Sequence, residues 1–255
     1  MKHSYLVVRS WKTRWRVLIF LRYSMKNYQN PFKTFKKHEW AIWLGSLVLV
    51  TVSFMFPRER DYLTLIASLI GVTSLILNAK GDPIGQVLTV VFSIFYSVIS
   101  FKFRYYGEMI TYLGMTAPIA LAAAISWFRH PYKEGENEVK VAHAGAKKWA
   151  VLIILTAAVT AAFYFILKYF NTAKLAISTV SVATSFIAAS LTLLRSPLYG
   201  LGYASNDIVL IIMWIMATID DPSYLPMIVC FSVFFVNDCY GFINWRKIRQ
   251  RQGEN

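Results

Sequence analysis

Eight apolar runs follow one another along this chain and limit what it can fold into. Each is about 17 to 22 residues long, the length that crosses the hydrocarbon core of a bilayer as an α-helix. Inside a bilayer, only helices and closed barrels satisfy their own backbone hydrogen bonds. We therefore predict an all-α integral membrane protein with about eight transmembrane helices, at roughly 40–56, 62–80, 83–101, 108–128, 149–169, 174–194, 203–219 and 224–245.

Composition agrees with a membrane protein and excludes a soluble domain of this length. Of the 255 residues, 56% are hydrophobic and 16% are charged, and the mean hydropathy is +0.46. The net charge of +14 raises the alternative of a nucleic-acid-binding protein. However, 10 of the 27 Lys and Arg residues lie in the first 38 positions, and most of the others lie in short segments between apolar runs. We therefore expect no nucleic-acid partner.

The distribution of basic residues predicts the orientation in the membrane. If the N-terminus is inside, 21 of the 27 Lys and Arg residues lie on the inner side and 6 on the outer side. An excess of Lys and Arg marks the cytoplasmic side of membrane proteins. We therefore expect both termini to be cytoplasmic.

The N-terminal segment mixes basic and apolar residues and precedes the first apolar run. Residues 11–28 are typical of an amphipathic helix lying on the surface of anionic lipids, and a disordered basic arm is the equal alternative. No signal-peptide pattern precedes the first run, so we expect this segment to be retained.

Two stretches of three apolar runs each resemble one another. Residues 62–129 and 175–247 both have a basic residue after the first run, Lys80 or Arg195, and both end in an Ile-Xaa-Trp pattern followed by basic residues. One run lies between them, so the two copies have the same direction across the membrane. We expect a 3+1+3 core with one extra span before it. The segments are 1–38 (basic cytoplasmic tail), 39–57 (accessory span), 58–129 (first repeat), 130–173 (cytoplasmic loop and linker span), 174–247 (second repeat) and 248–255 (cytoplasmic tail).

Several classes of chemistry lack their usual residues. All four histidines lie in the expected cytoplasmic tail or loop, so the spans offer no histidine as metal ligand or proton relay. No nucleotide-binding Gly-rich loop ending in Gly-Lys-Ser/Thr occurs. Cys230 and Cys239 lie nine residues apart, on opposite faces of a helix. We therefore expect no metal, no cofactor and no enzymatic activity; a membrane-embedded enzyme remains the weaker alternative.

Polar side chains within the apolar runs are the candidate binding residues. Amides are costly to bury in hydrocarbon, so Gln86, Asn206, Asn237 and Asn244 are expected either to line a pathway or to join helices. Asn237, Tyr240 and Asn244 share one helix face. A carboxylate at bilayer depth costs at least about 2.5 to 3.5 kcal/mol, so Asp238 needs a partner or a function. Asp207 has a structural alternative as a helix cap.

Two aromatic residues occupy equivalent positions in the two repeats. Tyr96 and Trp214 are 118 residues apart, each in the middle of its span. Aromatic residues usually serve packing, but two rings facing each other across a repeat interface also suit a flat, cationic ligand. Pro118, in the middle of another span, is expected to kink its helix.

These features resemble the bacterial nicotinamide riboside transporters of the PnuC type. The resemblance covers about 62–247 and depends on Ala79-Lys80-Gly81, Tyr106-Gly107-Glu108-Met109-Ile110, Pro118, Trp127, Asn206-Asp207, Trp214 and above all the nonamer Asn237 to Trp245. It implies a homotrimer in the inner membrane with a SWEET-like core. Each protomer would take up nicotinamide riboside, a precursor of NAD, by facilitated diffusion. Many members have tryptophans where this chain has Tyr199 and Tyr203.

The implied substrate suits the candidate residues. Nicotinamide riboside carries a permanently cationic, flat ring, a carboxamide and a neutral ribose. Aromatic faces attract the ring, amides bond the carboxamide and ribose, and a carboxylate such as Asp238 offsets the charge. We expect discrimination against the phosphorylated mononucleotide, because no Lys or Arg is expected at mid-membrane depth. A transporter of another vitamin or a sugar is the alternative.

Overall fold

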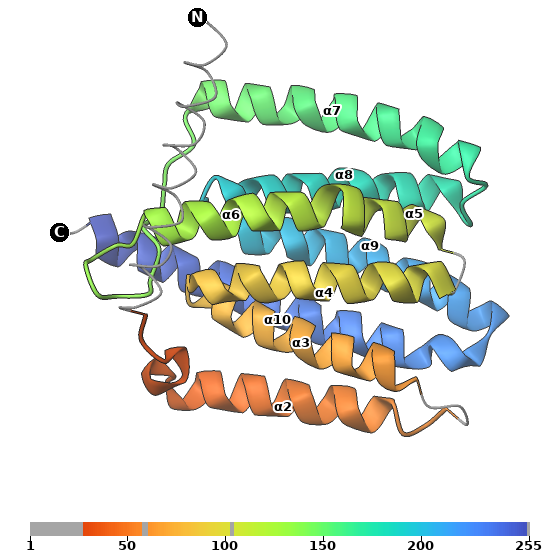
Figure 1. Ribbon diagram of the computed structural model, residues 1–255, viewed down its shortest axis with the longest axis horizontal. Helices are drawn as coiled ribbons and strands as arrows, with labels where there is room; N and C mark the ends of the chain where they lie inside the picture. The colour runs from red at the N-terminus through yellow and green to blue at the C-terminus, as the bar shows by residue number, and fades with distance from the viewer. Residues whose placement is uncertain (1–27, 58–60, 103–104, 254–255) are drawn as a thin grey trace, which may run out of the picture.

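The computed structural model describes residues 28–57, 61–102 and 105–253 (Figure 1). The surface helix expected at 11–28 lies outside these residues, except for Tyr28. The elements are a 3-10 turn (Pro31–Thr34), α2 (Lys37–Ser53), α3 (Tyr62–Ala79), α4 (Pro83–Lys102), α5 (Tyr106–Thr111), a π-helical turn (Tyr112–Thr116), α6 (Ala117–Arg129), α7 (Ala146–Tyr169), α8 (Leu175–Leu193), α9 (Tyr199–Asp220), a 3-10 turn (Pro222–Tyr224) and α10 (Leu225–Gly253).

Seven helical segments among the described residues are long and apolar enough to cross a membrane. They are α3, α4, the continuous segment from α5 to α6, α7, α8, α9 and α10 with its preceding turn. Helix α2 has 17 residues and is also apolar over most of its length. The prediction of an all-α, multi-pass membrane protein with about eight spans is therefore confirmed at the level of seven to eight helices.

Six helices form a closed ring. Each packs against the next in the order α3, α4, α6, α8, α9 and α10, and α10 packs back against α3. Two further helices lie outside the ring (Figure 1): α2 contacts α3 and α10, whereas α7 contacts α8. The interior of the ring is therefore enclosed by three helices from each of the two similar stretches of sequence.

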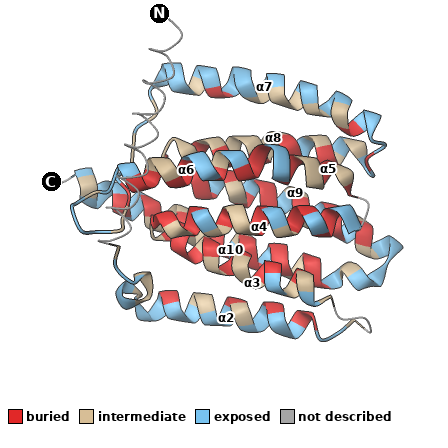
Figure 2. Ribbon diagram, viewed as in Figure 1, coloured by how far each residue is buried: buried red, intermediate tan, exposed pale blue. Residues whose placement is uncertain are grey.

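Burial separates the ring from the outer helices (Figure 2). Helix α7 buries only Leu152 and Leu167, and its other apolar side chains are exposed or half-buried. In a membrane protein such apolar surface faces lipid or another chain. In contrast, α10 buries eleven residues, from Pro226 to Ile248. The ring therefore holds the core, and α7 contributes little to it.

The segment containing Pro118 changes helical geometry one turn before the proline. Residues Tyr112–Thr116 form a π-helical turn between α5 and α6. Proline has no N–H, so the carbonyl one turn earlier loses its usual partner and the local hydrogen-bond spacing widens. This wider helical turn directs Tyr112 and Thr116 toward the interior of the ring, where both are buried.

One end of the bundle carries most of the described basic residues, and we name it the basic end. The first described residues, the α3–α4 turn, the 130–145 loop and the end of α10 all lie there, at the left of Figure 1. Helix α10 continues past the expected boundary at 245 and ends at Gly253. The charged residues after Trp245 therefore extend the last span as a helix beyond its apolar part.

Candidate functional site

A small cavity lies inside the ring, and its wall is formed by α3, α4, α8, α9, α10 and the π-helical turn before α6. Its volume is about 40 Å³, enough for roughly three water molecules. Polar and aromatic side chains dominate the lining, which comprises Gly71, Ser74, Leu75, Asn78, Thr89, Phe92, Tyr112, Thr116, Ser185, Tyr203, Asn206, Asp207, Phe231, Phe234 and Asp238. We name it the central cavity. A wall this polar in the middle of a membrane protein points to a ligand or a water path.

Asn206 and Asp207 lie side by side in α9 and both reach the central cavity. The Asn206 side-chain oxygen accepts hydrogen bonds from the hydroxyls of Thr184 and Ser185 in α8, at 2.8 and 2.9 Å. These bonds fix the amide, so that its NH₂ group remains available to the cavity. The two residues were predicted from sequence as site residues, and the structure brings both to the cavity.

Asn78 connects the cavity to a second amide, Gln86. The Asn78 side chain donates to the Thr89 hydroxyl at 3.1 Å and accepts from the Gln86 NH₂ group at 2.8 Å. Gln86 therefore acts behind the wall rather than in it, and its own oxygen has no partner. Sequence reasoning missed Asn78. It is an amide near the end of an apolar run, so the criterion that selected Gln86 also applied to it.

The second predicted carboxyl group, Asp238 of α10, faces Asp207 across the cavity wall. The two carboxyl groups lie within hydrogen-bonding reach of each other. Both residues are buried, with 3% and 2% exposure for Asp207 and Asp238. Helices α9 and α10 approach closely because Gly200 has no side chain: a Cβ there would lie 2.6 Å from the Asp238 carbonyl oxygen. This contact brings the two acids together.

Several buried polar atoms in and around the central cavity have no hydrogen-bond partner. Among the described residues, two of these atoms belong to the cavity wall, one oxygen of Asp207 and the hydroxyl of Thr116; one oxygen each of Gln86 and Asn237, outside the lining, also lacks a partner. A buried polar group without a partner costs roughly 1 to 3 kcal/mol. Such groups are rare in proteins and call for water or a ligand. Together with the polar wall, the unpartnered groups of Thr116 and Asp207 make the central cavity the candidate binding site.

The two aromatic residues predicted as a clamp do not line the central cavity. Tyr96 packs against Phe92 and Tyr112, with ring centroids 5.6 and 4.4 Å apart. Trp214 packs against Tyr105 and Tyr224, at 5.2 and 5.6 Å. Both are almost fully buried in the same core cluster. The aromatic residues that do reach the cavity are Phe92, Tyr112, Tyr203, Phe231 and Phe234.

The polar residues on one face of α10, Asn237, Tyr240 and Asn244, contact two neighbouring helices, α2 and α3. Asn237 donates to the Ser46 hydroxyl of α2 at 2.9 Å, and Tyr240 donates to Glu39 of α2 at 3.0 Å. Asn244 donates to the Ala79 carbonyl at 2.8 Å. The structure therefore brings Asn206, Asp207 and Asp238 together at the central cavity. It places Asn237, Tyr240 and Asn244 against α2 and the end of α3.

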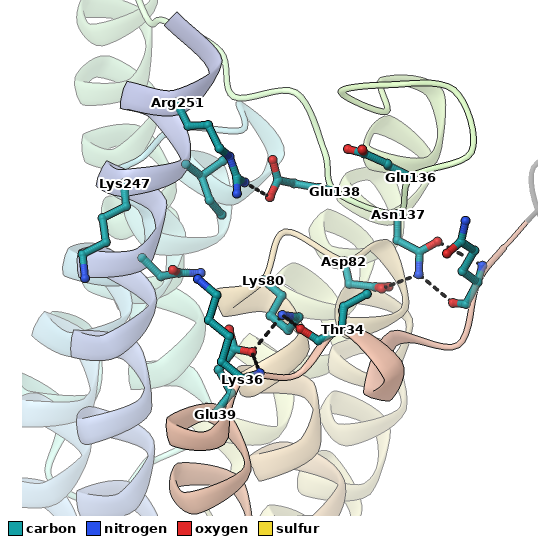
Figure 3. Close-up of a pocket in the computed structure, with 13 residues that line it drawn as sticks. Thr34, Lys36, Glu39, Lys80, Asp82, Glu136, Asn137, Glu138, Lys247 and Arg251 are labelled. Atoms are coloured by element: carbon teal, nitrogen blue, oxygen red, sulfur yellow. Dashed lines mark hydrogen bonds and ion pairs between the residues drawn. The ribbon is translucent and has the colours of Figure 1, made fainter. Parts of the chain in front are cut away.

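A second, larger pocket lies at the basic end, with a volume of about 370 Å³ (Figure 3). Charged side chains line it, and several of them pair with one another. Lys80 contacts Glu39 at 2.9 Å, and Arg251 forms an ion pair with Glu138. Residues from the segment 28–36, α2, the α3–α4 turn, the 130–145 loop and α10 meet here. We name it the basic-end pocket; its ion pairs join α2 to the α3–α4 turn and the 130–145 loop to α10.

Asp82 closes one side of the basic-end pocket. Its carboxyl oxygens accept hydrogen bonds from the Tyr28 hydroxyl at 2.7 Å and from the Asn137 NH₂ group at 3.0 Å. Burial raises the pKa of the Asp82 carboxyl above its usual value of 3.8, although these bonds and the Ile84 N–H favour the charged form. Burial and the Asp82 charge raise the pKa of Tyr28. Asp82 thus ties the loop and the N-terminal segment to the ring.

The chain matches one protein family and two related transporters of known name. The family model for nicotinamide mononucleotide transporters matches residues 61–247. The nicotinamide riboside transporter PnuC of Neisseria mucosa is 24% identical over 84% of this chain and 83% of its own length. The corresponding protein of Haemophilus influenzae is 22% identical over 83% of this chain and 91% of its own length.

A solved structure shares the fold. The crystal structure of the vitamin B3 transporter PnuC superposes with a TM-score of 0.75. It is 23% identical in sequence, and the match covers 86% of this chain and 94% of that chain. The resemblance noted from the motifs is therefore confirmed.

Proposed function

We propose, because this chain belongs to the family of nicotinamide mononucleotide transporters, that it carries nicotinamide riboside across the bacterial cytoplasmic membrane through the central cavity. Members of this family are transporters and not enzymes, so the alternative of a membrane-embedded enzyme is set aside. The observation that carries the proposal is the polar wall of the central cavity, where Asn206, Asp207 and Asp238 meet and where the Thr116 hydroxyl and one Asp207 oxygen have no partner.

The chemistry of the cavity supports nicotinamide riboside as the substrate. Both curated relatives are named for it. Asn206 offers an NH₂ group and Asn78 a further amide to the carboxamide and ribose, and the phenyl rings of Phe231 and Phe234 offer faces to the pyridinium ring. Asp207 and Asp238 supply negative charge next to the same space.

The same cavity is unsuited to a phosphorylated ligand, although the family model is named for the mononucleotide. Its lining includes no Lys, Arg or His, and it includes two acids. A phosphate dianion in this position would lack charge-assisted hydrogen bonds and would be repelled by the carboxyl groups. We therefore propose that nicotinamide riboside is preferred over its mononucleotide.

The architecture proposed for transport is a 3+1+3 core with α2 as an accessory span. The ring supports it, because α3, α4 and α6 occupy one half and α8, α9 and α10 the other, with α7 as the linker. The proposal places the basic end in the cytoplasm, with both termini there. It also includes a homotrimer, which the family resemblance implies, and contacts of the basic segment 1–38 with anionic lipids.

Movement of the two halves is required, because the central cavity is too small for the proposed substrate. A volume of about 40 Å³ holds a few waters and no nucleoside. We propose that the halves rock about this site and expose it alternately to the two sides, with the substrate gradient alone as the driving force. In this facilitated diffusion, the chain needs no nucleotide and no imposed ion gradient.

Uptake of radiolabelled nicotinamide riboside into proteoliposomes tests the proposal. The expected result is saturable uptake at equal pH on both sides, which stops when the internal and external concentrations are equal. Excess unlabelled riboside should compete, whereas the mononucleotide should compete weakly. Uptake that occurs only with a proton gradient would reject facilitated diffusion.

The competing candidate is a transporter of the same architecture for another vitamin or a sugar. A thermal shift panel of nicotinamide riboside, its mononucleotide, thiamine and simple sugars separates the two. Stabilisation by the riboside alone supports the proposal. Stabilisation only by thiamine or a sugar would favour the alternative.

A further inference from the structure

Two acids share the wall of the central cavity, and each is almost completely buried. Asp207 and Asp238 come from different helices, and their carboxyl groups lie within hydrogen-bonding reach. Two carboxyl groups can form a hydrogen bond only if one of them carries a proton, because an ionised carboxylate has no donor. One oxygen of Asp207 still lacks a partner.

No positive charge of the ring lies near this pair. Basic residues of the ring helices lie only in their terminal parts; Lys102 ends α4 and Arg129 ends α6. The first basic residue of α10 is Arg246, eight positions after Asp238, which corresponds to about 12 Å along the helix axis. Two ionised carboxylates at this depth would therefore be repelled by each other without compensation.

The other titratable groups around the pair carry no positive charge either. Helix α9 contributes Tyr199 and Tyr203, and the π-helical turn contributes Tyr112. Helix α10 contributes Cys230 and Cys239. Helices α3 and α8 contain no charged residue. Helix α2 packs against α10 nearer the basic end, where His38 and Glu39 contact Tyr240.

We propose that the Asp207–Asp238 pair exchanges a proton for the cationic substrate. The inference rests on the proposed function, because it needs a ligand with a permanent positive charge. In the empty cavity the two acids share one proton. When the pyridinium ring enters, the O–H bond of the protonated carboxyl breaks, the proton leaves to water, and both carboxylates face the cation.

The charge balance explains why such an exchange suits a membrane site. The empty pair with one proton has a net charge of minus one. The occupied pair, with two negative charges and one cation, has the same net charge. The empty and the occupied site therefore have the same net charge in the low-dielectric interior. At no stage are two ionised carboxylates buried without a proton or a cation beside them. At equal pH on both sides, the substrate gradient remains the driving force.

Calorimetry measures the exchanged proton directly. Binding of nicotinamide riboside to the purified full chain is titrated at one pH in two buffers that differ in ionisation enthalpy. The difference in observed heat gives the number of protons released. We expect about one proton per riboside bound, with an apparent affinity that rises up to about tenfold per pH unit while the pair titrates.

A neutral ligand provides the matched comparison on the wild-type protein. The reduced riboside has an uncharged dihydropyridine ring and nearly the same shape, so its binding should release no proton and should not strengthen with pH. Asp238→Asn and Asp207→Asn should bind the cationic riboside with no proton release. Glu108→Gln should still release one, because Glu108 is a buried acid of the same ring outside the cavity lining.

The outcomes separate the inference from the proposed function. Tight binding of the cationic riboside with no proton release between pH 5 and 8 would overturn the exchange and leave the transporter proposal standing. Equal proton release with the reduced riboside would also overturn it. Absence of binding by either form would reject the proposed function and the exchange with it.

Discussion

The central cavity and the basic-end pocket are both lined by polar side chains, but they differ in whether these groups have partners. In the basic-end pocket, Lys80 pairs with Glu39, Arg251 pairs with Glu138, and Asp82 accepts bonds from two side chains. In the wall of the central cavity, one oxygen of Asp207 and the hydroxyl of Thr116 are buried without a partner.

This difference separates polarity that holds the fold from polarity kept for a ligand. Groups that bond one another stabilise the contact between segments and leave little for a ligand to gain. Groups that stay unpartnered cost stability until something binds. Substitutions in the two regions should therefore affect stability and affinity in opposite proportion.

The largest effect is expected at Trp214, which lies in the core outside the cavity lining. Trp214→Ala removes a fully buried ring between Tyr105 and Tyr224 and should lower stability by about 3 to 5 kcal/mol. Thermal unfolding in detergent measures it. Trp214→Phe keeps much of the packing and should leave riboside affinity near that of the wild type. A tenfold loss in that variant would show that the binding site extends to this ring.

The next effect is expected at Glu39 in the basic-end pocket. Glu39→Gln leaves the Lys80 ammonium without its counter-charge and should lower stability by about 2 to 3 kcal/mol. Riboside affinity should change less than threefold. Glu138→Gln is the matched control: its partner Arg251 is 58% exposed, so the loss should stay below about 1 kcal/mol. Equal losses of stability in the two variants would contradict the claim that the buried ion pair contributes more than the exposed one.

Asn206 tests the opposite region. Asn206→Ala removes the cavity amide and should weaken riboside binding about tenfold to thirtyfold, or about 1.4 to 2 kcal/mol. Stability should change by less than about 1 kcal/mol, because Thr184 still donates to helix carbonyls. Ser205→Ala, the exposed neighbour, should change neither quantity. Calorimetry and thermal unfolding report the two quantities. If the variant is destabilised but binds the riboside normally, Asn206 stabilises the fold and does not bind the substrate.

The smallest effect is expected from the pH dependence of Asp82. Because its folded pKa lies above the unfolded value of 3.8, the folded state holds its proton more tightly. The stabilising contribution is therefore complete below that value and is lost as pH rises through the folded pKa. The melting temperature of Asp82→Asn should fall less than that of the wild type between pH 4 and 7. The exposed Asp221→Asn should follow the wild type.

Much of the fold could be predicted from apolar run length, and part of the site from buried polarity. Apart from the end of α10, the runs placed the long helices within a few residues, and the costly polar residues Asn206, Asp207 and Asp238 do meet at one cavity. A polar stripe shows that a helix face meets protein but not which neighbour it meets. The stripe predicted Asn237 and Tyr240 as pathway residues, and the structure shows that both contact α2.

The rest depended on packing that sequence does not encode locally. The approach of α9 to α10 at Gly200 brings the two acids together, and no motif spacing predicts it. Likewise, the π-helical turn before Pro118 rotates Tyr112 and Thr116 into the cavity, whereas the sequence predicted only a kink.

A structure of the chain with nicotinamide riboside bound tests the central claim most directly. The account predicts the pyridinium ring inside the helix ring, next to Asp207 and Asp238, with its carboxamide or ribose bonded to Asn206 and the cavity enlarged from its present volume of about 40 Å³. Riboside bound in the basic-end pocket, with the central cavity unchanged, would contradict it.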